Sequence, residues 1–262
     1  MTFYVITGAA RGIGLEFVSQ LSADSSNIIF ALVRNKSSAT ALNNLPGSNI
    51  NVVEADITDV ESLTSAANAV AGATAGKLDY LINNAGIHDH SKATLDAFPT
   101  KDALDQDLLE NFRVNTLGTI HATNAFLPLL RAGTAKKVIT ISTGAADLDF
   151  ANMTGSATQA GYAISKAALN MAIAKFAAAL KREGFVFLSI SPGLVDTAAA
   201  ERTPQESEQY KAFTQALTKM APNFSGPLTS QTSVKMMLEV IYRWTIEDTG
   251  AFVSHHGNKE WL

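Results

Sequence analysis

Short runs of apolar residues alternate along this chain with longer stretches that carry a helical pattern. Most of the short runs are continuously apolar, which is typical of strands buried on both faces of a parallel sheet. They cover residues 3–7, 28–33, 50–55, 78–83, 137–142, 185–191 and 250–253. Helical patterns cover residues 13–23, 59–73, 101–117, 161–182 and 229–243. This order predicts a single doubly wound α/β domain of the Rossmann type over residues 1–262, with seven mostly parallel strands and helices on both faces.

The composition limits the classes of function. A net charge of −4 gives no overall attraction to nucleic acid or to an anionic membrane. The chain has no cysteine, which excludes disulfides, thiolate metal sites and thiol catalysis and fits a reducing compartment. No stretch approaches the ~18 consecutive apolar residues of a membrane helix, and the first strand follows without a secretory signal pattern. We therefore expect a cytoplasmic protein that acts on a small molecule, without nucleic acid or membrane as a partner.

Residues 196–227 depart from the strand–helix alternation. They follow a predicted strand and carry only a weak helical pattern, between Pro204 and Met220. A long excursion at the carboxyl end of a strand favours a lid over a ligand crevice, although a surface insertion without function would give the same pattern.

The turn after the first predicted strand contains Gly8, Gly12 and Gly14 in the spacing G-x-x-x-G-x-G. Glycine permits backbone conformations and close contacts that a Cβ would prevent. A helix is predicted from Ile13, and the N–H groups at a helix N-terminus attract phosphate. The loop, together with Arg11, therefore predicts a pyrophosphate site for a dinucleotide, although a plain strand–helix turn also uses glycine.

The end of the second predicted strand indicates which nicotinamide cofactor is bound. A carboxylate there would accept from the ribose 2′-hydroxyl and repel a 2′-phosphate. The first charged residue is instead Arg34, with Lys36 close by and Arg11 in the glycine loop. A guanidinium suits a phosphate dianion, so the sequence predicts NADP(H) over NAD(H), unless these are ordinary solvated surface cations.

Tyr162 and Lys166 are four residues apart in the helix predicted over 161–182, which places them on one helix face. Beside a positively charged nicotinamide ring, we expect the cations to lower the tyrosine pKa from its usual ~10. A phenol with a pKa closer to neutral is a better general acid. The pair is thus a candidate for protonating a carbonyl oxygen, although a tyrosine and a lysine at this spacing are common on ordinary helices.

These motifs together resemble the short-chain dehydrogenase/reductase family. The matching pieces follow the family's order: Thr7-Gly8-x-x-x-Gly12-x-Gly14, Asp56-Ile57, Asn83-Asn84-Ala85-Gly86, Asn115, Tyr162-x-x-x-Lys166 and Pro192-Gly193-x-Val195-x-Thr197. The ending, from Gly250 through Gly257 to Trp261, is similar to the C-factor and sniffer-like branch, which includes fungal polyketide ketoreductases of the norsolorinic acid type.

The resemblance implies a role for each matched position. Those that contact the cofactor would be Asp56 and Ile57 at the adenine, Asn83, Ala85 and Gly86 at the adenosine side, and Pro192, Gly193, Val195 and Thr197 at the nicotinamide. Lys166 would also hold the nicotinamide ribose, and Asn115 would order a helix carbonyl and a water that relays protons to Lys166. The helices over 101–117 and 161–182 would form the core of a homodimer or homotetramer.

The family also places a serine after the fifth strand, where its hydroxyl bonds the substrate carbonyl. In this chain the aligned residue is Thr143, with Ser142 as the alternative. A threonine hydroxyl offers the same donor and acceptor as serine. Residues 144–159, a longer connection than is usual in the family, should border the substrate pocket.

The predicted function is hydride transfer between NADP(H) and a ketone, an aldehyde or a secondary alcohol, most plausibly an apolar or aromatic metabolite. Two alternatives stay open: an NADP(H)-binding regulatory or signalling protein without enzymatic activity, and a biosynthetic reductase of imines or enones. His88 and His90 would edge the active site or be solvated, and the adjacent His255 and His256 make a poor metal site because no carboxylate stands at ligand spacing.

Overall fold

A seven-stranded sheet forms the centre of the computed structural model, which describes residues 1–88, 93–196, 208, 211, 214–215, 217–219, 221 and 224–262. The strand order is β3-β2-β1-β4-β5-β6-β7, and each neighbouring pair is parallel. The strands are β1 Thr2–Thr7, β2 Asn27–Val33, β3 Ile50–Glu54, β4 Tyr80–Asn83, β5 Lys137–Ile141, β6 Val186–Ser191 and β7 Ala251–Ser254. The predicted α/β class with a seven-stranded sheet is confirmed.

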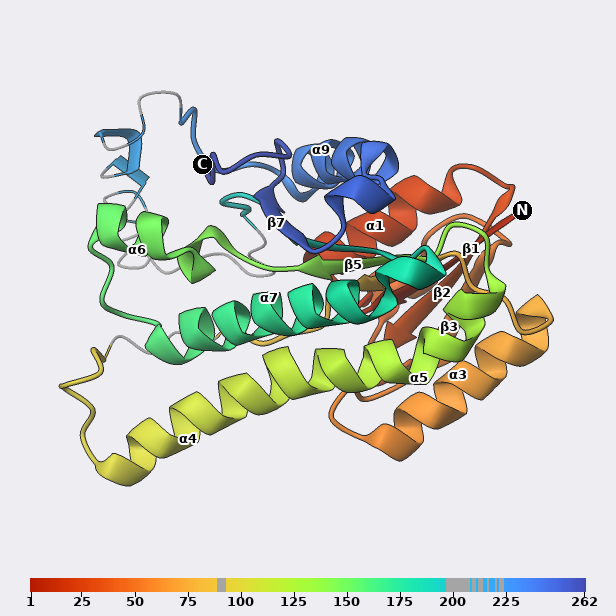
Figure 1. Cartoon of the computed structure of the whole chain (residues 1–262), viewed down its shortest axis with the longest axis horizontal. Coiled ribbons are helices and arrows are strands. Elements are labelled where there is room, and N and C mark those ends of the chain that lie inside the picture. Colours follow the sequence, from red (N-terminus) through yellow and green to blue (C-terminus); the bar gives the residue numbers. More distant parts are fainter. Residues whose placement is uncertain are drawn as a thin grey trace.

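Helices cover both faces of this sheet (Figure 1). The α-helices with described bounds are α1 Gly12–Ser22, α2 Thr40–Asn43, α3 Val60–Thr74, α4 Lys101–Asn111, α5 Thr119–Ala132, α6 Leu148–Thr154, α7 Ala160–Leu180 and α9 Ser230–Arg243. A π-helical segment, η1 Phe112–Gly118, joins α4 to α5, and three short 3₁₀ turns are η2 Gly144–Ala146, η3 Lys181–Glu183 and η4 Ile246–Asp248.

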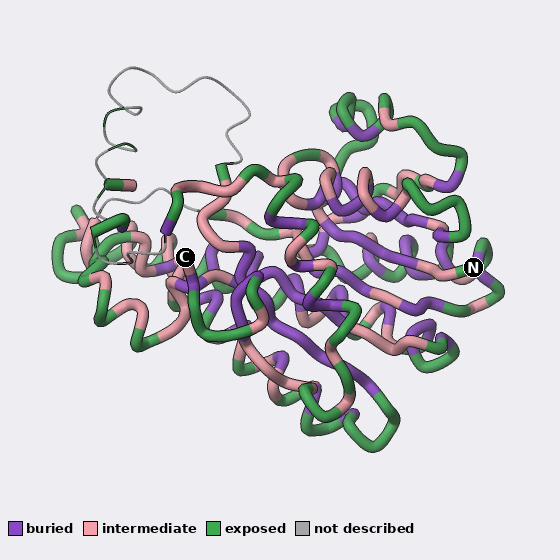
Figure 2. The backbone as a smooth tube through the Cα atoms, turned by 90° about the horizontal axis from the view of Figure 1, so that it is seen from above, coloured by how far each residue is buried: buried purple, intermediate pink, exposed green. Residues whose placement is uncertain are grey.

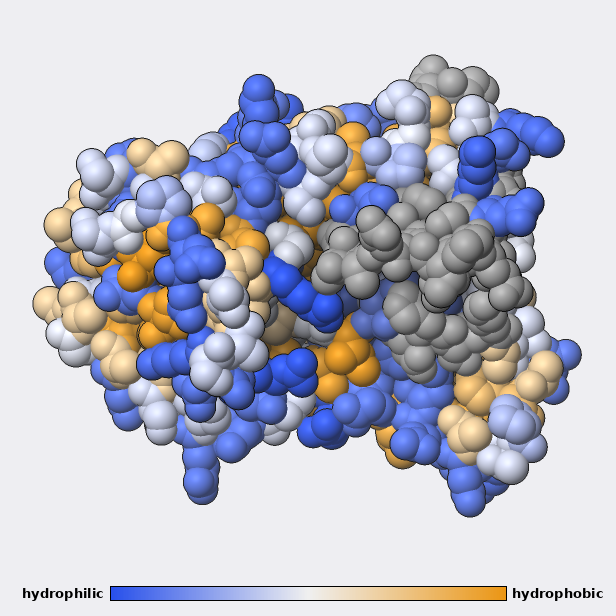
Figure 3. Space-filling view, turned by 180° about the vertical axis from the view of Figure 1, so that it is seen from behind, coloured by the Kyte–Doolittle hydropathy of each residue, from blue (hydrophilic) through white to orange (hydrophobic). Residues whose placement is uncertain are grey.

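The two faces of the sheet each carry a buried apolar cluster. Val5 and Leu81 point to the cluster shared with α3, α5 and α7, whereas Ile6 and Ile82 point to the cluster shared with α1 and α9. Successive residues of a strand point to opposite faces, so strands that are apolar throughout fill both clusters. Figure 2 shows the strands as largely buried, and Figure 3 shows hydrophilic side chains interleaved with smaller apolar groups on one outer face.

The helix expected over 101–117 is the main difference from the predicted elements. Three consecutive helical segments, α4, η1 and α5, run from Lys101 to Ala132. The second half carries signals against a helix, because Pro128 lies inside α5 and the hydroxyls of Thr119 and Thr123 donate to carbonyls four residues earlier. Burial of Phe126 and of the same face of α5 in the core outweighs these local signals. The short helices α2 and α6 were also not expected.

Helix α7 with its extension to Glu183 is, within the described part of the chain, the one helix long and apolar enough to cross a membrane by length and composition. It packs against η1, α4 and β6, and it contributes Leu169, Ile173 and Ala177 to the buried cluster. It is therefore a core helix of this fold.

Parallel pairing brings the carboxyl ends of β1, β4, β5 and β6 to one edge of the sheet, on the left in Figure 1. In doubly wound folds, ligands bind in the crevice outside this edge. Most of the predicted site residues follow one of these strands or lie at the start of α7, so the topology gathers them there.

Candidate active site

The glycine loop after β1 packs tightly against the segment after β4. Gly8 has φ +68°, and a Cβ on it would lie 2.8 Å from the Ala85 Cα. A Cβ on Gly14 would collide with the Gly8 carbonyl and the Asn84 amide. The Asn84 Nδ2 donates to the carbonyls of Thr7 at 3.1 Å and Gly8 at 3.0 Å. Glycine is therefore needed at both positions for this close approach.

Thr7 and Asn84 link the glycine loop to the segment after β4, a role that the sequence did not predict. The Thr7 hydroxyl accepts from the backbone N–H groups of Asn84 at 3.1 Å and Ala85 at 3.0 Å. These bonds fix the two loops to each other. Both residues belong to the family motifs, but their bonding partners follow from the pairing of β1 with β4, which the sequence alone does not give.

The N-terminus of α1 fits the phosphate site predicted for it. Arg11 is the N-cap in an extended conformation, without a side-chain capping bond, and the first turn holds no acidic residue. The first N–H groups of a helix have no partner within the helix, and here no side chain of this turn competes for them.

The region expected to hold the adenosine also contains Glu54, an acidic residue that lies at the end of β3 and not of β2. Glu54, at the end of β3, accepts from the Lys36 backbone N–H at 3.2 Å. Asp56 accepts from the Thr58 N–H and hydroxyl, each at 2.8 Å. Burial raises the pKa of Asp56, but these bonds and the nearby Arg34 outweigh burial and lower its pKa. The neighbourhood of Arg34 and Lys36 is thus less purely cationic than the sequence suggested.

Asn115 lies fully buried in η1 and joins three parts of the site. Its Oδ1 accepts from the Ile87 N–H at 2.8 Å, and its Nδ2 donates to the Ile87 carbonyl and the Ser165 hydroxyl, each at 3.0 Å. A Cβ on Gly86 would lie 2.8 Å from the Asn115 Oδ1 and 3.4 Å from the Lys166 Nζ. π-helical turns often occur at functional sites, and this one directs Asn115 between α7 and the segment after β4.

Thr143 and Ser142 lie in different surroundings. The Thr143 hydroxyl lies close enough to the phenol of Tyr162 to lower its pKa, and it accepts from the Ala145 N–H at 3.2 Å. The Ser142 Oγ is buried and has no partner among the described residues. Of the two hydroxyls, only that of Thr143 affects the pKa of the predicted proton donor.

Burial dominates the pKa of Tyr162 in the protein without cofactor. Burial raises the pKa of Tyr162 to about 12, and the nearby Thr143 hydroxyl acts in the opposite direction. Lys166 is not among the groups that shift this pKa, and its Nζ donates to the Ile141 carbonyl at 2.8 Å. Burial lowers the pKa of Lys166 to about 8. A phenol buried away from water is harder to ionise, so any lowering of its pKa requires a further positive charge.

His88 contacts the same tyrosine. Its ring meets the ring of Tyr162 edge to face, with centroids 4.4 Å apart and planes at 84°. The sequence left this histidine open as either an edge of the site or a solvated residue; in the structure it is exposed to solvent and also contacts Tyr162. His90 lies outside the described residues.

The turn after β6, expected to line the nicotinamide, is held by contacts with α9 and with the segment after β7. The Pro192 carbonyl accepts from the Ser233 hydroxyl at 2.7 Å, and Gly193 lies against the ring of His255. Burial and the adjacent His256 lower the pKa of His255 to about 4. Val195 pairs with Leu228, which brings together the two ends of residues 196–227. Thr197 lies outside the described residues.

The remaining expected positions are Asn83, at the end of β4, and Ile57. Asn83 is buried and its Nδ2 donates to the Thr123 hydroxyl at 3.0 Å, which ties β4 to α5. Ile57 lies against Gly118 of η1. Within the described ranges, no group of three or more His, Asp or Glu side chains is placed to hold a metal ion.

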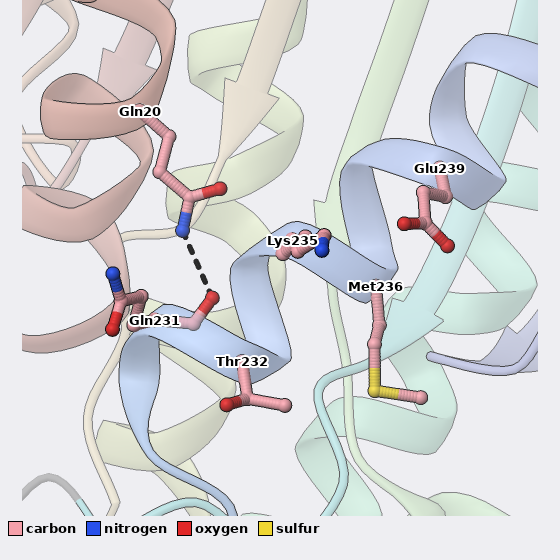
Figure 4. A pocket seen from close by; sticks show the side chains of 6 residues that line it. All are labelled: Gln20, Gln231, Thr232, Lys235, Met236 and Glu239. Atoms are coloured by element: carbon pink, nitrogen blue, oxygen red, sulfur yellow. Dashed lines mark hydrogen bonds between the residues drawn. The ribbon is translucent and has the colours of Figure 1, made fainter.

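A pocket on the outer side of the sheet lies apart from these residues (Figure 4). It is open to solvent, encloses about 500 Å³ between α1 and α9, and is lined by Gln20, Gln231, Thr232, Lys235, Met236 and Glu239. Gln20 crosses it and donates to the Gln231 carbonyl at 2.9 Å. None of its lining residues belongs to the predicted site.

Comparison with known proteins defines the family. The family profile described as short chain dehydrogenase matches residues 2–208. The short chain dehydrogenase virK of Hypocrea virens is 44% identical over 273 residues, with 100% of both chains covered. The short-chain dehydrogenase/reductase atnB of Arthrinium sp is 40% identical over 269 residues, also with 100% of both covered. The chain therefore belongs to the short-chain dehydrogenase/reductase family, oxidoreductases that use NAD(H) or NADP(H).

Solved structures of two carbonyl reductases are similar to this chain over nearly its whole length. The NADPH-bound carbonyl reductase from chicken fatty liver has a TM-score of 0.78 and 28% identity, over 98% of both chains. The carbonyl reductase Sniffer of D. melanogaster has a TM-score of 0.78 and 25% identity, over 98% of this chain and 97% of that one. The family expected from the motifs is confirmed, and the similarity to Sniffer agrees with the branch expected from the C-terminal residues.

Proposed function

We propose that this protein reduces a carbonyl group with NADPH, using Tyr162 as the proton donor. One observation carries the proposal: the Thr143 hydroxyl lies close enough to the Tyr162 phenol to lower its pKa, and Lys166 lies one helical turn from Tyr162. A phenol and a second hydroxyl that lie near each other can both reach one oxygen atom. Such an oxygen would be that of a carbonyl group bound between them and the cofactor.

The residues present fit a dinucleotide. The glycine loop leaves no room for side chains at Gly8 and Gly14, and the uncapped N-terminus of α1 faces the same crevice. NADPH, when bound, supplies the hydride. Gly86, which the family resemblance puts beside the cofactor, also has no room for a side chain, because a Cβ there would press on Asn115 and Lys166.

In the proposed reaction Tyr162 donates its phenolic proton to the carbonyl oxygen as the alcohol forms, and Thr143 donates a hydrogen bond to the same oxygen. Lys166 is buried with a lowered pKa, so its ammonium gains from an additional polar partner, which we propose to be the nicotinamide ribose. Asn115 keeps the segment after β4 and the start of α7 in register through Ile87 and Ser165.

The substrate proposed is apolar or aromatic. On α6, which lies in the connection between Thr143 and Tyr162, Leu148 is 79% exposed and Met153 is 52% exposed. Exposed apolar side chains on one short helix of this connection favour a ligand or another segment that covers them. Residues 196–227, most of which lie outside the described residues, remain the proposed lid, and the Val195–Leu228 pair holds its two ends together.

A panel of carbonyl compounds tests this proposal. Phenanthrenequinone, acetophenone and aliphatic ketones are mixed with NADPH, and turnover is followed by the loss of NADPH absorbance. Tyr162→Phe should lower kcat about a hundredfold to ten-thousandfold while NADPH still binds. Tyr242→Phe, at the exposed end of α9, is the matched control and should keep full activity.

The same panel separates the alternatives. A regulatory protein would bind NADPH but turn over no carbonyl compound, and the exchange of Tyr162 would change nothing. A reductase of imines or enones would turn over those substrates and tolerate Tyr162→Phe. Either result would contradict the proposed role of Tyr162.

We propose NADP(H) as the cofactor because Arg11, Arg34 and Lys36 take part in no ion pair among the described residues. Arg34→Glu removes one charge-assisted bond to the 2′-phosphate and adds a carboxylate that repels it, so the Kd for NADPH should rise at least about tenfold to a hundredfold, while the Kd for NADH should stay unchanged or fall. Arg182→Glu, an exposed substitution in η3, is the control. An equal effect on both cofactors would contradict the assignment.

A homodimer is proposed through α4, η1 and α7. Leu109 and Phe112 are exposed on the first two, and Ile164 and Met171 are exposed two turns apart on one face of α7. Met171→Glu should shift the protein to monomer in size-exclusion chromatography with light scattering. Val60→Glu, an equally exposed apolar site on α3, should leave the mass unchanged. A wild-type monomer would contradict the dimer.

A further inference from the structure

The end of the chain returns to the active site. β7 stops at Ser254, whose N–H donates to the Asn258 carbonyl at 2.7 Å, and this tight turn reverses the chain. Lys259 and Trp261 then lie beside Phe252 of β7. The indole of Trp261 stacks on the Phe252 ring with centroids 4.5 Å apart, and the Lys259 ammonium lies 5.0 Å and 5.1 Å from the two ring centres. We call Phe252, Lys259 and Trp261 the C-terminal clamp.

Trp261 lies directly on the backbone next to Thr143. It is only 7% exposed, and a Cβ on Gly144 would be 2.8 Å from the Trp261 Cβ and 3.0 Å from its Cγ. Any side chain at position 144 would push the indole away. The contact therefore joins the last residues of the chain to the residue that follows the proposed catalytic hydroxyl.

Lys259 holds the other end of the same turn. Its Nζ lies 3.0 Å from the Asp147 Oδ2, while the Asp147 Oδ1 accepts from the Phe150 N–H at 3.1 Å and so caps α6. An exposed ion pair alone contributes little. This one is reinforced by two aromatic rings under the ammonium, and its carboxylate starts a helix.

Between these two contacts lies the turn that carries Thr143. The Ala146 N–H donates to the Thr143 carbonyl at 3.1 Å, and the Asp147 N–H donates to the Gly144 carbonyl at 2.9 Å. On its inner side the Gly144 N–H donates to the Ser191 hydroxyl at 3.1 Å. The turn is thus held on one side by Ser191 of β6 and on the other by Trp261 and Lys259 of the clamp.

We propose that the C-terminal clamp is a positioning element for catalysis, which holds the 143–147 turn so that the Thr143 hydroxyl meets Tyr162 and α6 stays beside the substrate. This inference rests on the proposed function. Trp261 and Lys259 are positioning residues, since neither touches the predicted proton donor. A small displacement of a catalytic group can lower a rate strongly, so the effect of the clamp should appear in kcat.

Hydrogen exchange tests the clamp without turnover. In Trp261→Ala, the amides of Ala145, Ala146, Asp147 and Phe150 should exchange about tenfold faster than in the wild type. The control is Trp244→Ala, which removes the only other tryptophan, at the opposite edge of the sheet, where its Nε1 bonds the Asp248 carbonyl. These four amides should exchange as in the wild type in that variant.

Kinetics tests the catalytic consequence with phenanthrenequinone and NADPH. Trp261→Ala should lower kcat about tenfold to a hundredfold and leave the Kd for NADPH nearly unchanged. Trp261→Phe keeps a ring stacked on Phe252 and should restore most of the activity. Lys259→Met keeps the apolar stem and should have a smaller effect than Trp261→Ala.

Three results would overturn the proposal: unchanged exchange at the turn in Trp261→Ala, unchanged kcat despite faster exchange, or an equal loss of kcat in Trp244→Ala. If the wild type reduces no carbonyl compound, the proposed function fails by itself. The exchange experiment then still decides whether the clamp orders the turn.

Discussion

Asn115→Ala removes the amide that joins η1 to the segment after β4 and to α7. Its bonds to the Ile87 N–H and carbonyl, at 2.8 and 3.0 Å, and to the Ser165 hydroxyl, at 3.0 Å, are lost together. A buried polar group left without a partner costs about 1–3 kcal/mol. Two backbone groups of Ile87 lose their partner, so the free energy of unfolding should fall by about 2–5 kcal/mol.

Urea denaturation followed by circular dichroism measures this loss as a lower midpoint with an unchanged slope. Asn170→Ala is the matched control, because both polar atoms of the Asn170 side chain are buried without a partner among the described residues. Its removal should cost less than about 1 kcal/mol, since no made hydrogen bond is lost. Equal losses in the two variants would refute the reasoning from hydrogen bonds.

Three further predictions concern the hydroxyl, a helix end and a buried carboxylate. Thr143→Val should lower kcat about a hundredfold with phenanthrenequinone, and Ser142→Ala much less; the reverse order would assign the hydroxyl to Ser142. Lys137→Met leaves the carbonyls of Ile241, Tyr242 and Trp244 at the end of α9 without their donor, and urea titration should show a loss of about 1–3 kcal/mol. The Asp79 carboxylate accepts hydrogen bonds from Phe3, Thr134 and Ala135. Burial raises the pKa of Asp79, but these bonds outweigh burial and lower the pKa overall. The ionised carboxylate therefore stabilises the fold above the unfolded pKa, and this stabilisation is lost as the pH falls through the folded pKa. Asp79→Asn should therefore lower the free energy of unfolding near neutral pH, and the difference from wild type should shrink below about pH 4; a constant difference would contradict it.

The strands, and the position of the site at the carboxyl edge of the sheet, could be predicted because both follow from short sequence patterns. Continuous apolar runs mark strands covered on both faces, and parallel pairing gathers their carboxyl ends. The motif around Gly8 and the spacing of Tyr162 and Lys166 are likewise short-range patterns. α5 was missed because Pro128 and the threonines oppose a helix locally, and only the packing of its buried face shows why it forms.

Contacts between distant segments could not be read from the sequence. The Lys166 bond to the Ile141 carbonyl, the approach of Glu54 to Lys36 and the return of Trp261 to Gly144 each join residues from separate elements. The lowering of the Tyr162 pKa beside a bound nicotinamide stays a prediction, but the opposing effect of burial, which raises this pKa in the protein alone, could not be read from the sequence. Charge and burial at one atom depend on the whole fold.

A crystal structure with NADP⁺ and a bound ketone or alcohol tests the central claim most directly. The account predicts that the hydroxyls of Tyr162 and Thr143 both lie within hydrogen-bond distance of the substrate oxygen, with Lys166 on the nicotinamide ribose. A substrate oxygen bonded by other groups, with the Tyr162 hydroxyl turned away from the nicotinamide, would contradict it.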